Sequence, residues 1–196
     1  MEAALDLSWE QSYGSVTIDD ICNRAGVKKG SFYYFFESKS DLAIAALERL
    51  WIEQWKPALD AQFSPSVEPL RRITGYLESI YTRQAAGKTK SGRVLGCPVC
   101  SLGSEVGTQD DKLSAKVREI FGRKKKYFES AIRDALAEGL VEPCDPAEKV
   151  ATLAGLVEGI LVQSRIMNDP ELVRRLPAMV LDVLRPKIAP VSSAHA

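Results

Sequence analysis

Several features that mark enzymes, secreted proteins and membrane proteins are scarce or missing in this 196-residue chain. It has one histidine, His195, and shows no carboxylate pair beside a nucleophile, no phosphate-binding glycine loop and no metal-ligand spacing, so we expect no enzyme activity, no metal and no cofactor. Four cysteines indicate reduced thiols and not a disulfide scaffold. No apolar run approaches the ~18–20 residues of a membrane span, and no secretory signal is recognisable, so we expect a cytoplasmic protein.

An excess of charge of one sign is also lacking, as is the alternating pattern of β-strands. The 26 Lys and Arg balance the 26 Asp and Glu, so any attraction to nucleic acid must be local. Apolar residues recur instead at helical spacing. The sequence therefore predicts an all-α fold without a sheet.

The segment 17–42, TIDDICNRAGVKKGSFYYFFESKSDL, is the most informative stretch. Thr17 and Asp20 form a capping box that begins one helix, and Gly26 supplies the left-handed residue that ends it. A second short helix follows from about Lys28, and Ser38 caps the start of a third. This spacing is typical of a helix-turn-helix, which places the end of one helix against DNA.

The second helix of this motif directs polar side chains outward, near the positive end of its dipole. Phosphates and base edges both suit that set of groups. A further lysine follows the Ser38 cap, beside the first free amides of the next helix. The candidate DNA-binding residues are Thr17, Lys28, Lys29, Gly30, Ser31, Tyr33, Tyr34 and Lys39.

These residues resemble the TetR family of transcriptional regulators. The matching positions are Thr17, Asp20-Ile21, Ala25-Gly26-Val27, Gly30, Tyr33, Phe35, Ser38-Lys39 and Leu42. The resemblance implies a homodimeric repressor that binds a palindromic stretch of double-stranded DNA and responds to a small-molecule effector. It also implies that Thr17, Tyr33, Tyr34 and Lys39 hold the DNA backbone, while residues 28–31 lie nearest the bases.

Two departures from the family pattern weaken this interpretation. Lys28 replaces the usual serine cap, which costs the helix about 0.5–2 kcal/mol. Residues 1–41 hold four bases against seven acids, and the basic arm that often precedes the first helix is absent from this sequence. A helical interaction protein that has lost DNA binding therefore remains an alternative.

Downstream of the motif, the pattern predicts a helix from Ser38 to Gln62 that Pro57 kinks or ends, and further helices from Pro69 to Ala86, after Pro98 and from 111 to 139. Another helix begins at Asp145, residues 168–170 break the chain, and a last helix runs to about Arg185. Residues 87–92 read as a flexible basic loop. The predicted domains are a helix-turn-helix domain (1–41), a ligand-binding and dimerisation domain (42–189) and a disordered tail (190–196).

The last two helices carry surplus apolar surface, which predicts a four-helix dimer interface. Small residues recur every four positions at Ala151, Gly155 and Gly159, so that another helix can approach closely. We place Val180 and Leu184 of the final helix in the same interface.

Aromatic or polar groups on otherwise inward-facing stripes are candidates for an effector pocket. Lys124 or Lys125 also falls where an apolar residue is expected, so that lysine either snorkels to water or meets a carboxylate ligand. The candidate pocket residues are Trp51, Trp55, Tyr76, Cys97, Phe121, Phe128, Glu158 and Gln163.

Cys97 and Cys100 lie in a segment similar to a G-C-x-x-x-N-L-x-x-E motif of one TetR subgroup, with Ser101 in place of Asn. Several interpretations stay open. Cys97 packs the short helix, or its thiol, activated at a helix N-terminus, senses oxidants or electrophiles with Cys100 as resolving partner. A metal site lacks further ligands, and a dithiol oxidoreductase lacks the strand that feeds such a motif.

Overall fold

The computed structural model describes residues 1–187 and confirms the all-α prediction. Within that range no strand forms, and one isolated bridge joins Val141 to Pro186. The predicted tail and His195 lie outside the described residues. The helices are α1 (Glu2–Glu10), α2 (Ile18–Ala25), α3 (Lys29–Phe35), α4 (Lys39–Leu50), α5 (Lys56–Gln62), α6 (Pro69–Ser91), α7 (Pro98–Val106), α8 (Asp111–Ala137), α9 (Pro146–Met167), α10 (Glu171–Arg174) and α11 (Leu176–Leu184).

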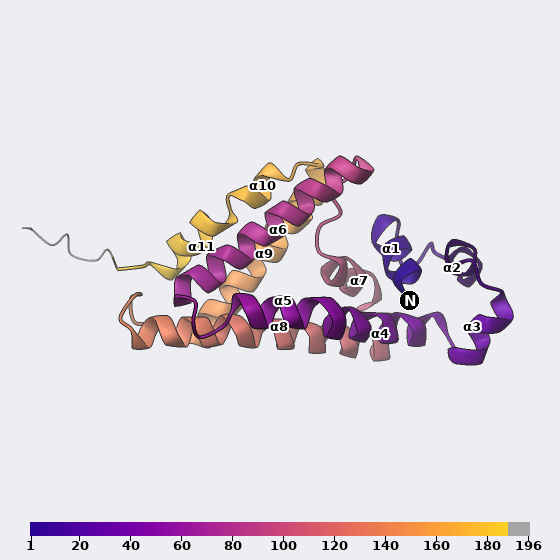
Figure 1. The fold of residues 1–196 in the computed structure, drawn as a ribbon, viewed down its shortest axis with the longest axis horizontal. Helices are drawn as coiled ribbons and strands as arrows, with labels where there is room; N and C mark the ends of the chain where they lie inside the picture. The colour runs from indigo at the N-terminus through magenta and orange to yellow at the C-terminus, as the bar shows by residue number, and fades with distance from the viewer. Residues whose placement is uncertain (188–196) are drawn as a thin grey trace, which may run out of the picture.

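Two hydrophobic cores organise these helices. Helices α1 to α3 gather at one end of the molecule, and α4 runs from there alongside α8 into the larger bundle (Figure 1). The small core ends at Leu42, while the next residue, Ala43, already belongs to the large one. Helix α4 is therefore shared by both cores. The small core comprises Ala4, Leu7, Val16, Ile21, Cys22, Phe32 and Leu42.

The helix-turn-helix forms from the local signals in its sequence. The Thr17 hydroxyl accepts a hydrogen bond from the Asp20 amide, while the Asp20 carboxylate accepts one from the Thr17 amide. Gly26 ends α2 with φ of 67°, in the left-handed region that glycine adopts without strain. Lys28 caps α3 without a side-chain hydrogen bond, as its replacement of serine predicts.

The predicted helix end at Pro57 does not occur, since the chain stays helical from Lys39 to Gln62, but the regular α-helix is interrupted just before this proline. A π-helical turn, η1 (Trp51–Trp55), joins α4 to α5. Proline lacks an amide hydrogen, and its ring crowds the carbonyl four residues back. We attribute the wider turn to this crowding. The turn buries Trp51 and leaves Trp55 partly buried.

The flexible loop predicted at 87–92 is also wrong, since α6 continues to Ser91. Hydroxyls of Thr89 and Ser91 donate hydrogen bonds to the carbonyls of Ala85 and Gly87 in the preceding turn. The helix ends only at Gly92, where φ is 72°. Thr89 and Ser91 are residue types with a low helix propensity, but their hydroxyl hydrogen bonds support this end of α6.

Helix α9 corrects the expectation about apolar runs. The helix has 22 residues and contains an 18-residue window with a mean hydropathy of 1.4, so by length and composition alone it could cross a membrane. It nevertheless packs against α8, α10 and α11 and contains Glu148, Lys149, Glu158 and Arg165. Core helices of globular proteins often have this composition.

Candidate DNA interface and effector cavity

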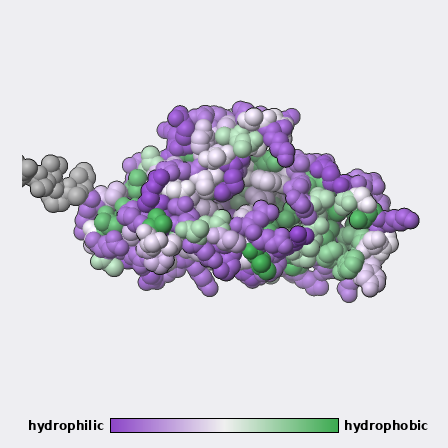
Figure 2. All heavy atoms as spheres, viewed as in Figure 1, coloured by the Kyte–Doolittle hydropathy of each residue, from purple (hydrophilic) through white to green (hydrophobic). Residues whose placement is uncertain are grey.

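Helix α3 presents the candidate DNA-binding surface at the end of the molecule (Figure 1). Phe32 is 5% exposed and anchors the helix to the small core, whereas Tyr33 is 54% and Tyr34 is 82% exposed. Lys28, Lys29, Gly30 and Ser31 are exposed as well. Figure 2 shows hydrophobic side chains gathering toward this end, on a face otherwise covered largely by hydrophilic ones. The exposed lysine, serine and tyrosine side chains of α3 can reach phosphates and base edges.

Neighbouring acids pair with most of the bases around α3. Lys29 lies 2.9 Å from Asp19, and Arg24 lies 3.1 Å from Glu10. Lys28 has no ion pair within residues 1–187 and is therefore the base most available to DNA. The excess of acidic over basic residues in positions 1–41 did not indicate which lysine would stay unpaired.

Lys39 is placed differently from the prediction. Its ammonium donates hydrogen bonds to the carbonyls of Tyr13 (2.8 Å) and Val16 (2.9 Å) and lies 4.3 Å from the centre of the Tyr13 ring. Burial lowers the pKa of this lysine, and the nearby Glu105 carboxylate opposes that shift. Lys39 thus fixes the loop after α1 and has little capacity left for a phosphate.

Phe35 is a surface aromatic residue that the sequence did not single out for DNA contact. Its side chain is 72% exposed, and its ring contacts that of Tyr34 with centroids 4.8 Å apart. Phe36, one residue later, packs against the small core instead. Helical spacing allowed either phenylalanine to be buried, and only the angle of α3 decided between them.

A cavity of about 390 Å³ lies in the larger bundle, lined by α1, α4, η1, α6, α7, α8 and α9. Six of the eight candidate pocket residues line it: Trp55, Tyr76, Cys97, Phe121, Phe128 and Glu158. Trp51 does not, because it is buried against Tyr127 and below Arg123. Gln163 does not either, because it lies on the exposed side of α9.

Two of the charged side chains that line this cavity, Lys124 and Glu158, are partly buried and form no ion pair among residues 1–187. The Lys124 ammonium lies 3.9 Å from the centre of the Trp55 ring. Burial alone would lower the pKa of Lys124, but the Tyr76, Cys97 and Glu158 groups outweigh it and raise the pKa. Oxygen Oε2 of Glu158 is buried and has no hydrogen-bond partner among the described residues. Each group is available to a ligand.

The surroundings of Cys97 oppose the thiol activation that one of its interpretations requires. Its sulfur caps α7 by accepting a hydrogen bond from the Cys100 amide at 3.4 Å. Burial raises the pKa of the Cys97 thiol to about 12, the Lys124 ammonium lowers it by less, and Glu158 raises it further. Burial and then Glu158 also raise the pKa of Cys100. Desolvation outweighs the helix dipole, which favours the structural role of Cys97.

The wall of the cavity is bonded to the DNA-binding end through α7 and α9. Arg165 donates to the Trp9 carbonyl (3.2 Å) and the Ser101 hydroxyl (2.7 Å), and the Trp9 indole donates to the Leu95 carbonyl (2.8 Å). Farther along α7, Glu105 accepts hydrogen bonds from Ser12 and from the Gly14 amide. These bonds hold α1 and its following loop against the larger bundle.

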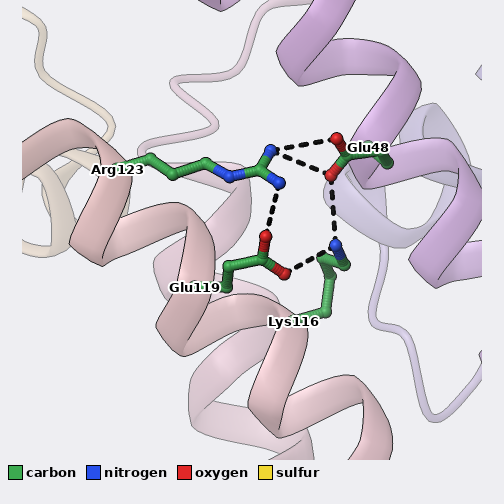
Figure 3. Close-up of polar contacts among 4 residues, drawn as sticks. All are labelled: Glu48, Lys116, Glu119 and Arg123. Carbon is green, nitrogen blue, oxygen red and sulfur yellow. Dashed lines mark hydrogen bonds and ion pairs between the residues drawn. The ribbon is translucent and has the colours of Figure 1, made fainter.

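A second link joins α4 to α8 (Figure 3). Glu48 on α4 accepts from Lys116 at 3.1 Å and from Arg123 at 2.9 Å, and Glu119 bridges the same two bases. Burial would raise the pKa of Glu48, but hydrogen bonds from Arg123 and Lys116 outweigh burial and lower it. Arg123 precedes Lys124, which lines the cavity, so this network joins the cavity wall to α4, the helix that follows α3.

The predicted dimer interface is only partly on the surface. Ala151, Gly155 and Gly159 are exposed, and a Cβ added at either glycine would meet no atom within 4 Å. Val180 and Leu184 were assigned wrongly, since both are buried inside the protomer at 0% and 1% exposure. The α9 stripe instead continues through three exposed apolar residues that the sequence analysis missed: Val162, Ile166 and Met167.

Known proteins match both parts of the chain. Residues 1–46 match the family model of bacterial regulatory proteins of the tetR family, and residues 69–180 match that of the tetracyclin repressor-like C-terminal domain. The transcriptional regulator AcuR of Cereibacter sphaeroides is 32% identical over 174 residues, which are 87% of this chain and 77% of AcuR.

Solved structures agree with this assignment. The regulatory protein TetR from Rhodobacter sphaeroides superposes with a TM-score of 0.79 at 26% identity, over 91% of this chain and 93% of that one. Reduced Escherichia coli NemR superposes with a TM-score of 0.80 at 21% identity, over 97% and 98% of the two chains. The chain therefore belongs to the TetR family of bacterial transcriptional regulators.

Proposed function

We propose that the protein is a homodimeric transcriptional repressor that leaves a palindromic operator when a small molecule fills the cavity. One observation carries this proposal: the DNA-binding end itself forms part of the cavity wall. Leu5, Asp6 and Trp9 of α1 line the cavity together with residues of η1, which continues the α4 helix. A ligand in contact with these residues must affect the position of α3.

The repressor role and the cytoplasmic location follow from the relatives and from the need to reach DNA. DhaR of Mycobacterium sp. and NemR of Escherichia coli are named transcriptional repressors, and they are 23% and 22% identical to this chain. A repressor of this kind needs no chemistry on its ligand. The ligand has only to favour a dimer whose two α3 helices no longer fit successive major grooves, ~34 Å apart.

The apolar side of α9 supports the homodimer. Only 28% of its most apolar 18-residue window is buried within one protomer, although the mean hydropathy of that window is 1.4. Exposed apolar stripes of this length usually mark a protein interface. Gly155 and Gly159 let a second α9 approach closely, and a twofold axis there would pair two DNA-binding ends.

We infer that two sets of contacts couple the cavity to the DNA-binding end, one made by α1 and one made by α4. On the α1 side, Arg165 joins Trp9 to α7 beside Cys97, which lines the cavity. On the α4 side, Glu48 is held by Arg123, the neighbour of Lys124. We infer that a ligand displacing α7 or α8 turns the DNA-binding end through these bonds.

Fluorescence anisotropy with DNA from upstream of the protein's own gene tests the proposal. We expect saturable, salt-sensitive binding of two protomers per site. Ala154→Phe, which adds a ring inside the cavity, should weaken this binding while the dimer persists. Ala137→Phe, at an exposed position on α8, is the matched control.

Absence of DNA binding in the wild-type protein would contradict the repressor assignment and favour a helical interaction protein. DNA binding that is equally strong in both variants would retain the regulator but separate the cavity from its control. Light scattering on the same samples reports whether each variant is still a dimer.

A further inference from the structure

Of the eight charged residues that line the cavity, Lys124 and Glu158 are partly buried, whereas the other six are exposed. Lys124 forms no hydrogen bond or ion pair within residues 1–187 and rests on the Trp55 ring. The buried Oε2 of Glu158 is likewise without a hydrogen bond there. A buried polar atom left unpaired costs free energy, so it is usually paired in the functional state.

These two groups influence each other without touching. The Glu158 carboxylate contributes to the raised pKa of Lys124, so the two lie within electrostatic reach. No ion pair joins them, although both belong to the same cavity lining. The Lys124 ammonium and the Glu158 carboxylate thus stay apart within the cavity, although opposite charges attract each other.

The charges around the cavity balance, which bears on the net charge of its ligand. Arg49 pairs with Glu53 at the lining, at 2.8 Å, and Arg83 donates to Ser79. A polyanion would meet as many acids as bases here. The charged lining residues are Glu2, Asp6, Glu53 and Glu158 against Arg49, Arg83, Lys124 and Lys125.

We propose that the cavity binds a small zwitterion, an amino acid with an apolar side chain, whose carboxylate meets Lys124 and whose ammonium meets Glu158. This inference rests on the proposed effector function and names the class of its ligand. The apolar side chain would lie against Phe121 and Phe128. A volume of about 390 Å³ is near the small end of ligand pockets, which are roughly 300–1,000 Å³.

The test is calorimetric titration of the DNA-free protein with two matched series of probes. The first series is L-phenylalanine, 3-phenylpropionate and phenethylamine, and the second is L-leucine, 4-methylpentanoate and 3-methylbutylamine. Within each series the apolar part stays similar while one charged group is removed. We expect a zwitterion to bind about tenfold or more tightly than both of its one-charge counterparts.

Two variants assign each charged group to its partner. In Glu158→Gln, the zwitterion should fall to the affinity of the corresponding carboxylate, and in Lys124→Met to that of the corresponding amine. Gln163→Ala on the exposed side of α9 and Lys126→Met on the exposed side of α8 are the matched controls, and neither should change affinity. Circular dichroism establishes that each variant is folded.

The proposal is overturned if no zwitterion binds better than its counterparts, including the case in which no probe binds at all. It is also overturned if both variants keep the full affinity of the wild type. Because these titrations contain no DNA, their result is independent of operator binding. If the protein binds its operator but binds no zwitterion, this inference fails and the proposed function stands.

Discussion

We expect the single side chain of Lys28 to supply much of the attraction to DNA in this protein without net charge. It is exposed at the start of α3, while Lys29 is paired with Asp19 and Lys39 is bonded to backbone carbonyls. Phosphate contacts release counterions, so each one steepens the salt dependence of binding.

We expect Lys28→Ala to weaken operator binding and to reduce the slope of log affinity against log salt by about 0.9. Anisotropy titrations at several salt concentrations measure this slope. Lys126→Ala removes an exposed lysine far along α8 and should leave it unchanged. An unchanged slope in Lys28→Ala would mean that this lysine does not contact a phosphate.

Cys97 provides a second prediction at the residue scale. With its pKa raised to about 12, the thiol is almost entirely protonated at neutral pH, and the thiolate that reacts appears only in strong alkali. The alkylation rate of Cys97 should therefore be far below that of an unfolded cysteine and should still be rising at pH 9.

Mass spectrometry after timed iodoacetamide treatment gives this rate for each cysteine, with the urea-unfolded chain as reference. Rapid modification of Cys97 at pH 7 would contradict the burial seen here and restore the electrophile-sensor hypothesis. Cys144, which is partly exposed, serves as an internal comparison.

At the scale of elements, the helix starts were predictable because their signals are local. Thr17, Ser38 and Asp145 each accept a hydrogen bond from an amide two or three residues later, as their positions in the sequence suggest. The π-helical turn before Pro57 and the extension of α6 to Ser91 were not predictable. Helix formation is cooperative, so an established helix continues through a few residues of weak preference.

The link between α4 and α8 should depend on pH. The pKa of Glu48 is lowered from its ordinary value of 4.5, so its contribution to stability is complete above that value. The contribution disappears as pH falls through the lower folded pKa. Glu48→Gln should therefore destabilise the protein at pH 7 and have no effect at strongly acidic pH.

Urea unfolding of the wild type and Glu48→Gln at several pH values measures this difference. Glu142→Gln, at an exposed position without a side-chain hydrogen bond among the described residues, is the control. A stability difference that stays constant as the pH falls would show that the charge of Glu48 is not what joins α4 to α8.

For the whole molecule, the proposed dimer depends on the surface stripe of α9. A large charged residue at Gly159 has room within the protomer, because nothing lies within 4 Å of its added Cβ. Gly159→Arg should therefore fold but remain monomeric, with operator affinity lowered by about a hundredfold, since one half-site alone is bound.

Light scattering and circular dichroism measure the mass and helix content of this variant. Gly87→Arg changes a glycine on α6 that has equally open surroundings, so it should stay dimeric. A dimeric Gly159→Arg would move the interface away from α9.

The sequence by itself determined the local structure of this protein and its family. Capping hydrogen bonds, the left-handed Gly26 and the outward polar residues of α3 depend on neighbours within a few positions, so one-dimensional spacing is enough to predict them. The six candidate residues that line the cavity were predictable for a related reason, since polar or aromatic groups on the inward faces of several helices come together inside the bundle.

Only the tertiary structure decided which groups are buried and which remain unpaired. It placed Val180 and Leu184 inside the protomer, Gln163 outside and Lys39 on backbone carbonyls. It also raised the pKa of Cys97, which favours the structural role among the interpretations that the sequence left open. Desolvation and ion pairing depend on helices distant in the chain, and the spacing of residues within one helix carries no information about them.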